Sequence, residues 1–360
     1  MDKLKNTRKR INEIDAKMAD LFVERMKAAT EIAEYKKMHG LPVLDPAREE
    51  EVISKNSQMV EDPALRAYYI SFLKNNMAVS RAWQDSLMKG MKVAYSGTEG
   101  AFAHIATSAH FPSARKISYR DFKSAYDSVV NGECDAAVLP LENSYNGEVG
   151  QVTDLMFSGS LYVNDIIELP VSQDLLAMPG TTLSDIKEVI SHPQALGQCE
   201  NYIKEHNFAI REYENTALAA KMVADSKNKS IAAIASAEAA KIFGLQVLAR
   251  NINESRSNTT RFAVFSRSLN KQEKKMGVHS IIMFTVRNEA GALAKAIEII
   301  GKHGFNMRTL RSRPMKELLW QYYFYVEAEG NIDTENGSVM IEELSEYCDK
   351  LKIMGNYTKE

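Results

Sequence analysis

The stretch Ser257-Asn258-Thr259-Thr260-Arg261-Phe262 leads directly into the apolar run Ala263-Val264-Phe265. A hydroxyl, a guanidinium and an aromatic ring therefore follow one another at the entrance of a predicted strand. Side chains of these types can hold an anion beside a departing hydroxyl group. Because so short a match also fits an ordinary strand entry, its meaning depends on the rest of the chain.

The composition describes core-forming material divided into several domains. The chain has 360 residues, of which 45% are apolar, and this length predicts two or three domains. A net charge of −2 argues against a nucleic-acid partner, because such proteins carry a basic footprint. Three cysteines are too few for a disulfide framework and too scattered for a metal site, so we interpret them as structural thiols.

The chain carries no predicted membrane segment. Its N-terminus is charged and lacks the apolar core of a signal peptide. No apolar run approaches the roughly 20 residues that cross a bilayer. We therefore expect a cytoplasmic protein.

From about residue 91, short apolar strands alternate with helical segments. This alternation predicts an open, largely parallel sheet system, whose ligands bind beyond the carboxyl ends of the strands. The predicted strands cover residues 92–95, 136–139, 189–191, 231–235 and 262–265.

Polar motifs lie at the ends of these strands. In chain order they are Gly97-x-x-Gly100, Pro140-x-Glu142-Asn143-Ser144-x-x-Gly147, Ser191-His192-Pro193-Gln194 with Gln198, and Thr260-Arg261-Phe262. Four motifs in this order make residues 91–268 resemble the prephenate dehydratases. Thr98 departs from the family, which often has proline there.

This resemblance implies an α/β domain with two lobes, like the periplasmic binding proteins, and a substrate cleft between them. The chain would cross between the lobes near Glu168 and return near Ala249. Loss of water and CO2 from prephenate needs a proton donor for the leaving hydroxyl. The resemblance assigns that role to Thr260, polarised by Arg261. It assigns positioning of the substrate to Asn143, Ser191 and Gln198, whereas His192 before Pro193 is typical of a helix cap.

The first 90 residues have a different, all-helical pattern. Apolar residues recur at helical spacing from Leu4 to about Met38, without Pro or Gly. Such a helix reaches roughly 50 Å at about 1.5 Å per residue, too long to bury its stripe within one small domain. We therefore expect a second copy of the chain to cover it. Two further helices are predicted, over residues 45–58 and 63–89.

Charged and polar residues along these helices resemble the site of the all-helical chorismate mutases over residues 1–90. The resemblance implies an intertwined dimer in which Arg8 reaches into the partner's site. Arg25 would bind substrate carboxylates with Arg8, while Lys36 and Gln84 would stabilise charge on the ether oxygen of chorismate. The remaining binding residues that it implies are Asp45, Arg48, Glu49 and Ser80.

After a polar linker at residues 268–277, the predicted order is strand, helix, two strands, helix and strand. This βαββαβ order, over residues 278–360, resembles the ACT regulatory domain. Two motifs resemble its phenylalanine-binding segments: Gly291-Ala292-Leu293-Ala294 and Ser312-Arg313-Pro314. Arg311 replaces the family's usual glutamate, and Ala294 replaces its common valine. A cation at position 311 would face either the ligand or the partner subunit; a purely structural role for the module is the alternative.

The three resemblances together predict a fused chorismate mutase and prephenate dehydratase, with a homodimer or higher oligomer and L-phenylalanine as effector. They imply no metal or organic cofactor. Two other interpretations stay open. The central domain could act on arogenate, or it could be a non-catalytic two-lobed ligand sensor.

Overall fold

The structure is a computed structural model that describes residues 2–255, 257–270, 277–315 and 321–358. The chain divides into two compact units, Met1–Lys92 with Ser113–Arg115 and Val93–Pro112 with Lys116–Glu360. Among the described residues, none of the helices combines the length and apolarity that spanning a bilayer requires.

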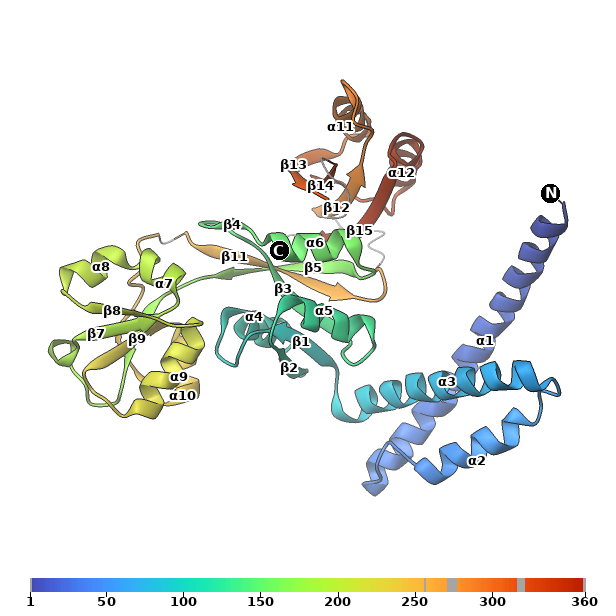
Figure 1. The fold of residues 1–360 in the computed structure, drawn as a ribbon, viewed down its shortest axis with the longest axis horizontal. Helices are drawn as coiled ribbons and strands as arrows, with labels where there is room; N and C mark the ends of the chain where they lie inside the picture. Colours follow the sequence, from blue (N-terminus) through green and yellow to red (C-terminus); the bar gives the residue numbers. More distant parts are fainter. Residues whose placement is uncertain (1, 256, 271–276, 316–320, 359–360) are drawn as a thin grey trace. The chain divides into compact units, whose positions relative to one another are not determined.

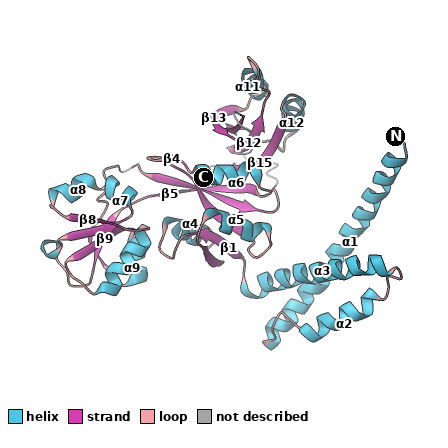
Figure 2. Cartoon of the chain, viewed as in Figure 1, coloured by secondary structure: helices cyan, strands magenta, loops and turns pink. Residues whose placement is uncertain are grey.

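The first unit is built from three helices, as predicted (Figure 2). They are α1 (Asp2–His39), α2 (Pro46–Ser57) and α3 (Pro63–Lys89). The side chain of Asp45 caps α2, and that of Asp62 caps α3, each followed by proline in the first turn. Gly40 ends α1 with a left-handed backbone that a residue with a Cβ adopts only at a cost.

Much of the apolar stripe of α1 is uncovered within the single chain. Ala29 and Ala33 are buried, yet Leu21, which precedes both on the same helix, is 64% exposed. Four more apolar residues continue this exposed stripe toward the N-terminus: Leu4, Ile11, Ile14 and Met18. An exposed apolar stripe of this extent is typical of an interaction surface.

The second unit contains the predicted two lobes, each built around a sheet (Figure 1). The first sheet has the order β2-β1-β3-β11-β5, with β4 paired to β3. Its strands are β1 (Lys92–Ser96), β2 (Arg115–Tyr119), β3 (Ala136–Asn143), β4 (Gly147–Glu148), β5 (Tyr162–Pro170) and β11 (Thr259–Ser266). Its helices are α4 (Phe102–His110), α5 (Phe122–Val130) and α6 (Gly150–Ser158).

The second sheet has the order β10-β6-β9-β7-β8. Its strands are β6 (Asp174–Ala177), β7 (Glu188–Ser191), β8 (Ala209–Glu212), β9 (Ile231–Ala235) and β10 (Gln246–Ala249). Its helices are η1 (Leu183–Asp185), α7 (Pro193–Gln198), α8 (Glu200–Glu205), α9 (Thr216–Ser226) and α10 (Ala237–Phe243). The chain enters this lobe after β5 and leaves it after β10, so the predicted crossings near Glu168 and Ala249 are confirmed.

The prediction of a largely parallel sheet system was wrong. β11 runs antiparallel to both β3 and β5, and β6 runs antiparallel to both β9 and β10. The chain leaves the first lobe along β5 and returns along β11. These two strands therefore run in opposite directions and pair antiparallel. As a result, the beginning of β11 lies beside the end of β3.

The C-terminal module, residues 278–358, has the predicted βαββαβ order. Its elements are β12 (Val278–Thr285), α11 (Ala292–Lys302), β13 (Asn306–Pro314), β14 (Tyr322–Glu329), α12 (Glu335–Tyr347) and β15 (Lys350–Thr358). The sheet order is β13-β14-β12-β15, with antiparallel pairing. Most of the predicted linker, residues 271–276, lies outside the described part of the chain.

The module's sheet is buried on both faces. Along β12, Ile282 and Phe284 pack under α11 and α12, whereas Ile281 and Met283 join the core of the first lobe. Alternating side chains of a strand point to opposite faces, so β12 is buried at every position. The module and the first lobe therefore share one hydrophobic core.

Gly355 lies at a close contact between the module and the first lobe. A Cβ at this position would lie 2.2 Å from the carbonyl oxygen of Val163 on β5, and φ is +137°. We expect Gly355→Ala to destabilise the second unit by about 2–4 kcal/mol, because it combines overpacking with a disfavoured backbone. Thermal unfolding measures this loss. Gly304→Ala is the control, because its φ is +77° but nothing lies within 4 Å of the added Cβ; an equal loss in both variants would contradict close packing at Gly355.

Candidate active sites

A cavity of about 390 Å³ lies among α1, α2 and α3. Seven of the eight residues predicted for a mutase site line it: Arg25, Lys36, Asp45, Arg48, Glu49, Ser80 and Gln84. The helices bring together residues that are up to 59 positions apart in sequence, from Arg25 to Gln84. The cavity wall is rich in cations, as a dicarboxylate ligand requires.

The polar groups of this cavity are held by specific contacts. Arg25 donates hydrogen bonds to the Ser80 hydroxyl and, at 3.3 Å, to the carbonyl oxygen of Asn76. Burial lowers the pKa of the Arg25 guanidinium. Lys36 Nζ donates to the Val43 carbonyl at 2.6 Å, and the buried Oε1 of Gln84 has no hydrogen-bond partner among the described residues. An unsatisfied buried amide at a cavity wall points to a ligand that satisfies it.

Arg81 is a further cavity residue that the sequence analysis left without a role. Its guanidinium forms an ion pair with Glu49 across the cavity. It directly follows Ser80 on α3 and precedes Gln84 by one helical turn, so helical spacing alone could have placed it here. Arg81 therefore balances the negative charge of Glu49, the only glutamate predicted for this site.

Arg8 does not lie in the cavity of its own chain. It precedes Arg25 by 17 residues on the same helix, about 26 Å at about 1.5 Å per residue. It lies instead on the exposed N-terminal part of α1.

In the second unit, Thr260 and Asn143 meet where β11 begins and β3 ends. They are register partners, and Asn143 Nδ2 donates to Thr260 Oγ1 at 2.9 Å. Both residues are 9% exposed. The antiparallel pairing of β11 with β3 thus joins two predicted site residues that are 117 positions apart.

A chain of amide hydrogen bonds connects this pair to the second lobe. Asn258 Oδ1 accepts from Asn143 Nδ2 at 2.8 Å, and Asn258 Nδ2 donates to Gln198 Oε1 at 3.1 Å. Gln173 Nε2 approaches the same Gln198 oxygen at 3.4 Å. Gln173 Oε1 is buried and has no partner among the described residues. Asn258 and Gln173 are therefore site residues that the sequence analysis missed, although Asn258 stands two positions before Thr260.

The side chains of Ser191 and His192 form hydrogen bonds within the second lobe. Ser191 is fully buried and its hydroxyl donates to the carbonyl of Ile234 on β9 at 2.6 Å. His192 caps α7 by accepting from the backbone of Gln194 at 3.2 Å, so its interpretation as a capping residue is confirmed.

The prediction that Arg261 polarises Thr260 was wrong. Neighbouring residues of a strand project to opposite faces, and Arg261 projects toward the C-terminal module while Thr260 projects toward Asn143. The guanidinium donates to both carboxylate oxygens of Glu327, at 3.0 and 2.8 Å, and to the Tyr357 hydroxyl at 2.8 Å.

The two predicted effector motifs lie on different elements of the module. Gly291 has φ +85° and begins α11, followed by Ala292 and Leu293. Ser312, Arg313 and Pro314 end β13. Arg313 Nε donates to Asp154 of α6 at 3.0 Å.

Arg311, which was predicted to face a ligand or a partner subunit, forms an ion pair with Glu142 of β3 in the same chain. This contact could not be predicted from the sequence, because the sequence does not show that the module's sheet packs against the first lobe.

Comparisons with known proteins cover both regions. Residues 93–270 match the family model of prephenate dehydratase, and residues 7–85 match that of chorismate mutase type II. A bifunctional chorismate mutase/prephenate dehydratase of Aquifex aeolicus is 32% identical over 363 residues, covering 100% of this chain and 99% of that protein.

Solved structures resemble about three quarters of the chain. A prephenate dehydratase of Arthrobacter aurescens in complex with L-Phe is 27% identical with a TM-score of 0.69, covering 74% of this chain and 90% of that one. GqqA, a novel type of quorum quenching acylase, is 30% identical with a TM-score of 0.69, covering 75% of this chain and 98% of that one.

The two family models follow each other in the same order as the two sites, and the match to the Aquifex protein extends over the full chain. The chain therefore belongs to the family of bifunctional chorismate mutase/prephenate dehydratases, enzymes of phenylalanine biosynthesis.

Proposed function

We propose that the two reactions take place at two separate sites, with roles set by the contacts described above. In the helical unit, Arg25 binds a carboxylate of chorismate, and Lys36 with Gln84 stabilises charge on the ether oxygen as the bond breaks. Glu49 and Asp45 bind the ring hydroxyl, while Arg48 and Ser80 complete the polar lining. The observation that carries this proposal is the single cavity that gathers seven predicted residues.

Arg8 of a second copy completes this mutase site. Two observations support a homodimer with shared sites: Arg8 lies about 26 Å along α1 from its own cavity, and the apolar stripe between them is exposed. Burying the stripe of one α1 against another would stabilise the dimer by the hydrophobic effect.

In the second unit, Thr260 is the proton donor to the leaving hydroxyl of prephenate. Asn143 fixes the Thr260 hydroxyl through a hydrogen bond. Asn258 forms hydrogen bonds with both Asn143 and Gln198 and so connects the two lobes. The hydroxyl of Ser191 is committed to β9, so Ser191 shapes the cleft through its backbone and its accepting lone pairs. The product after loss of water and CO2 is phenylpyruvate.

The C-terminal module is an ACT-type effector domain for L-phenylalanine. Three features support this proposal: the βαββαβ order, the Gly291-Ala292-Leu293 and Ser312-Arg313-Pro314 motifs, and the L-Phe complex of the Arthrobacter relative. The proposed domains are a mutase domain over residues 1–90, a dehydratase domain over residues 91–268 and an ACT-type domain over residues 278–360.

Separate sites predict separable activities. Lys36→Ala should abolish chorismate turnover and leave prephenate turnover near normal. Thr260→Ala should do the reverse, lowering kcat for prephenate by on the order of a hundredfold with little change in KM, because a proton donor acts in the transition state. Both activities are measured by following the formation of prephenate and of phenylpyruvate with each variant. The dehydratase assay is repeated with arogenate as a second substrate. A joint loss of both activities in a folded variant would contradict separate sites.

Shared mutase sites predict complementation. Mixing an Arg8→Ala chain with an Arg25→Ala chain should restore part of the mutase activity, because each mixed dimer places both defects in one site and leaves the other intact. The control is an Arg8→Ala chain mixed with itself under the same conditions of subunit exchange. Exchange without recovery would show that Arg8 serves no site of a second copy.

An effector role predicts stereospecific binding of L-phenylalanine to the full chain. Titration calorimetry should detect L-phenylalanine and not D-phenylalanine, and saturating L-phenylalanine should change prephenate turnover about 5- to 150-fold, the range of allosteric coupling free energies of 1–3 kcal/mol. Equal responses to both enantiomers, or none to either, would leave the module a structural part of the enzyme.

A further inference from the structure

The strands that carry the proposed dehydration site are anchored from behind by charged side chains. On β11, Thr260 faces Asn143 and Arg261 faces the C-terminal module. On β3, a register shift at Leu141 sets Glu142 opposite Arg261 and Asn143 opposite Thr260. Each site residue therefore has an ionised neighbour in sequence that projects to the opposite face.

Arg261 is held by the module through a buried pair. Its side chain is 18% exposed and that of Glu327 is 5% exposed. The carboxylate of Glu327 accepts both guanidinium hydrogen bonds and also the hydroxyl hydrogen bonds of Tyr325 and Tyr357. Arg261 lies over the Tyr357 ring as well, 5.9 Å from its centre. Planar, two-point recognition of this kind fixes the direction of a guanidinium as well as its position.

The surroundings keep Glu327 ionised. Burial alone would raise its pKa, but the hydrogen bonds and charge of Arg261, with the hydroxyls of Tyr357 and Tyr325, outweigh burial and lower the pKa. A buried carboxylate that loses its partner becomes an uncompensated charge. Small movements of Arg261 away from Glu327 are therefore costly, and β11 is held in one place at the residue that adjoins Thr260.

From this geometry we propose that Glu327 and Tyr357 are positioning residues for dehydration, acting through Arg261 to hold the start of β11 and thereby the Thr260 hydroxyl. The C-terminal module is then part of the dehydratase's working structure even without an effector. Glu142 and Arg311 add a second pair at the end of β3, beside Asn143.

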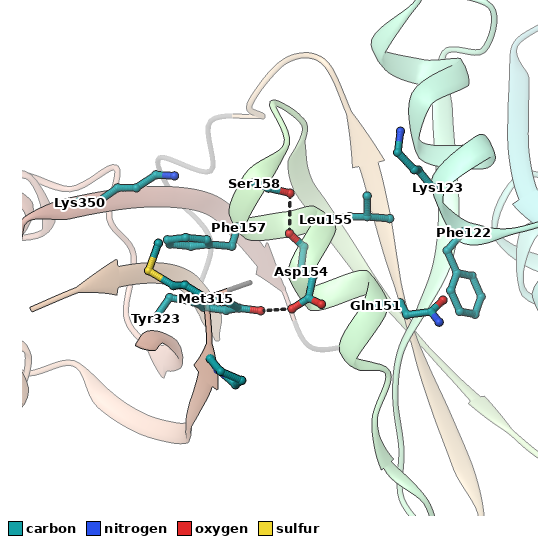
Figure 3. Close-up of a pocket in the computed structure, with 11 residues that line it drawn as sticks. Phe122, Lys123, Gln151, Asp154, Leu155, Phe157, Ser158, Met315, Tyr323 and Lys350 are labelled. Atoms are coloured by element: carbon teal, nitrogen blue, oxygen red, sulfur yellow. Dashed lines mark hydrogen bonds between the residues drawn. The ribbon is translucent and has the colours of Figure 1, made fainter. Parts of the chain in front are cut away.

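A simpler explanation is that the pair only docks the module. A different anchor provides the comparison, because Tyr323 donates to Asp154 of α6 at 2.7 Å (Figure 3). Arg313 donates to the same oxygen at 3.0 Å. This anchor lies beside a cavity of about 460 Å³ and contacts α6 rather than β3 or β11. Docking would depend on both anchors, whereas positioning of Thr260 depends only on the Glu327 anchor.

Two buried tyrosines of the module make a matched test, since each is 2% exposed and each loses one hydroxyl on change to phenylalanine. We expect Tyr357→Phe to lower kcat for prephenate about threefold and Glu327→Gln about tenfold, with KM within about twofold, because small displacements of a reacting group reduce turnover steeply. Tyr323→Phe should leave kcat unchanged. Glu329→Gln is the control for Glu327→Gln, because Glu329 lies on the same strand and pairs with Arg308 at the surface.

Thermal unfolding of the same full-length chains reports whether the second unit stays folded, and chorismate turnover, at its separate site, should not change. An equal loss of kcat in Tyr357→Phe and Tyr323→Phe would overturn the proposal. A normal kcat in both Tyr357→Phe and Glu327→Gln would also overturn it. If Glu327→Gln fails to fold, the comparison of the two tyrosine variants decides alone. Because the proposal rests on the assignment of Thr260, Thr260→Ala is assayed in parallel. Normal turnover in Thr260→Ala would overturn the site assignment, whereas loss there with normal turnover in Glu327→Gln would overturn the positioning role alone.

Discussion

The antiparallel pairing of β11 with β3 is the constraint on which the second unit depends. It brings the first residues of one strand beside the last residues of the other, so Thr260 and Asn143 meet although 117 positions separate them. The same pairing places Glu142 and Arg261 opposite each other on the reverse face. One pair of strands thus presents uncharged hydrogen-bonding groups to the cleft and charged groups to the C-terminal module.

The reverse face combines a shared apolar core with a buried ion pair. Aliphatic and aromatic residues of β12, β14 and β15 pack into the core of the first lobe. The ion pair between Glu327 and Arg261 fixes the direction of the guanidinium. The folded pKa of Glu327 is lowered, so its contribution to stability is present above its unfolded pKa of about 4.5 and is lost as the pH falls through the folded value. Near neutral pH the anchor is intact.

Helices and their ends could be predicted from the sequence because their determinants are local. Asp45-Pro46 and Asp62-Pro63 are caps followed by first-turn prolines, and the structure places both helices within one residue of the predicted starts. The mutase site followed from the resemblance to the chorismate mutases, and seven of its eight residues share a cavity. The exposed apolar stripe of α1 is the surface on which the proposed second copy would pack.

The second unit was harder because its decisive features are not local. A strand pattern does not reveal whether a neighbour runs parallel, so the antiparallel direction of β11 was missed, and with it the side to which Arg261 projects. Asn258 looked like part of a strand entry, yet it bridges Asn143 and Gln198. Arg311 could be assigned only by comparison with a ligand motif, whereas its partner Glu142 is 169 positions away.

The central claim is that the C-terminal module holds β3 and β11 in their working arrangement, and hydrogen–deuterium exchange of the full chain tests it most directly. Glu327→Gln should speed exchange of backbone amides in β3 (residues 136–143) and β11 (residues 259–266), because these two strands lose an anchor. The amides of β9 in the other lobe should keep their protection. Unchanged exchange in β3 and β11, in a variant whose Glu327 carboxylate is gone, would contradict it.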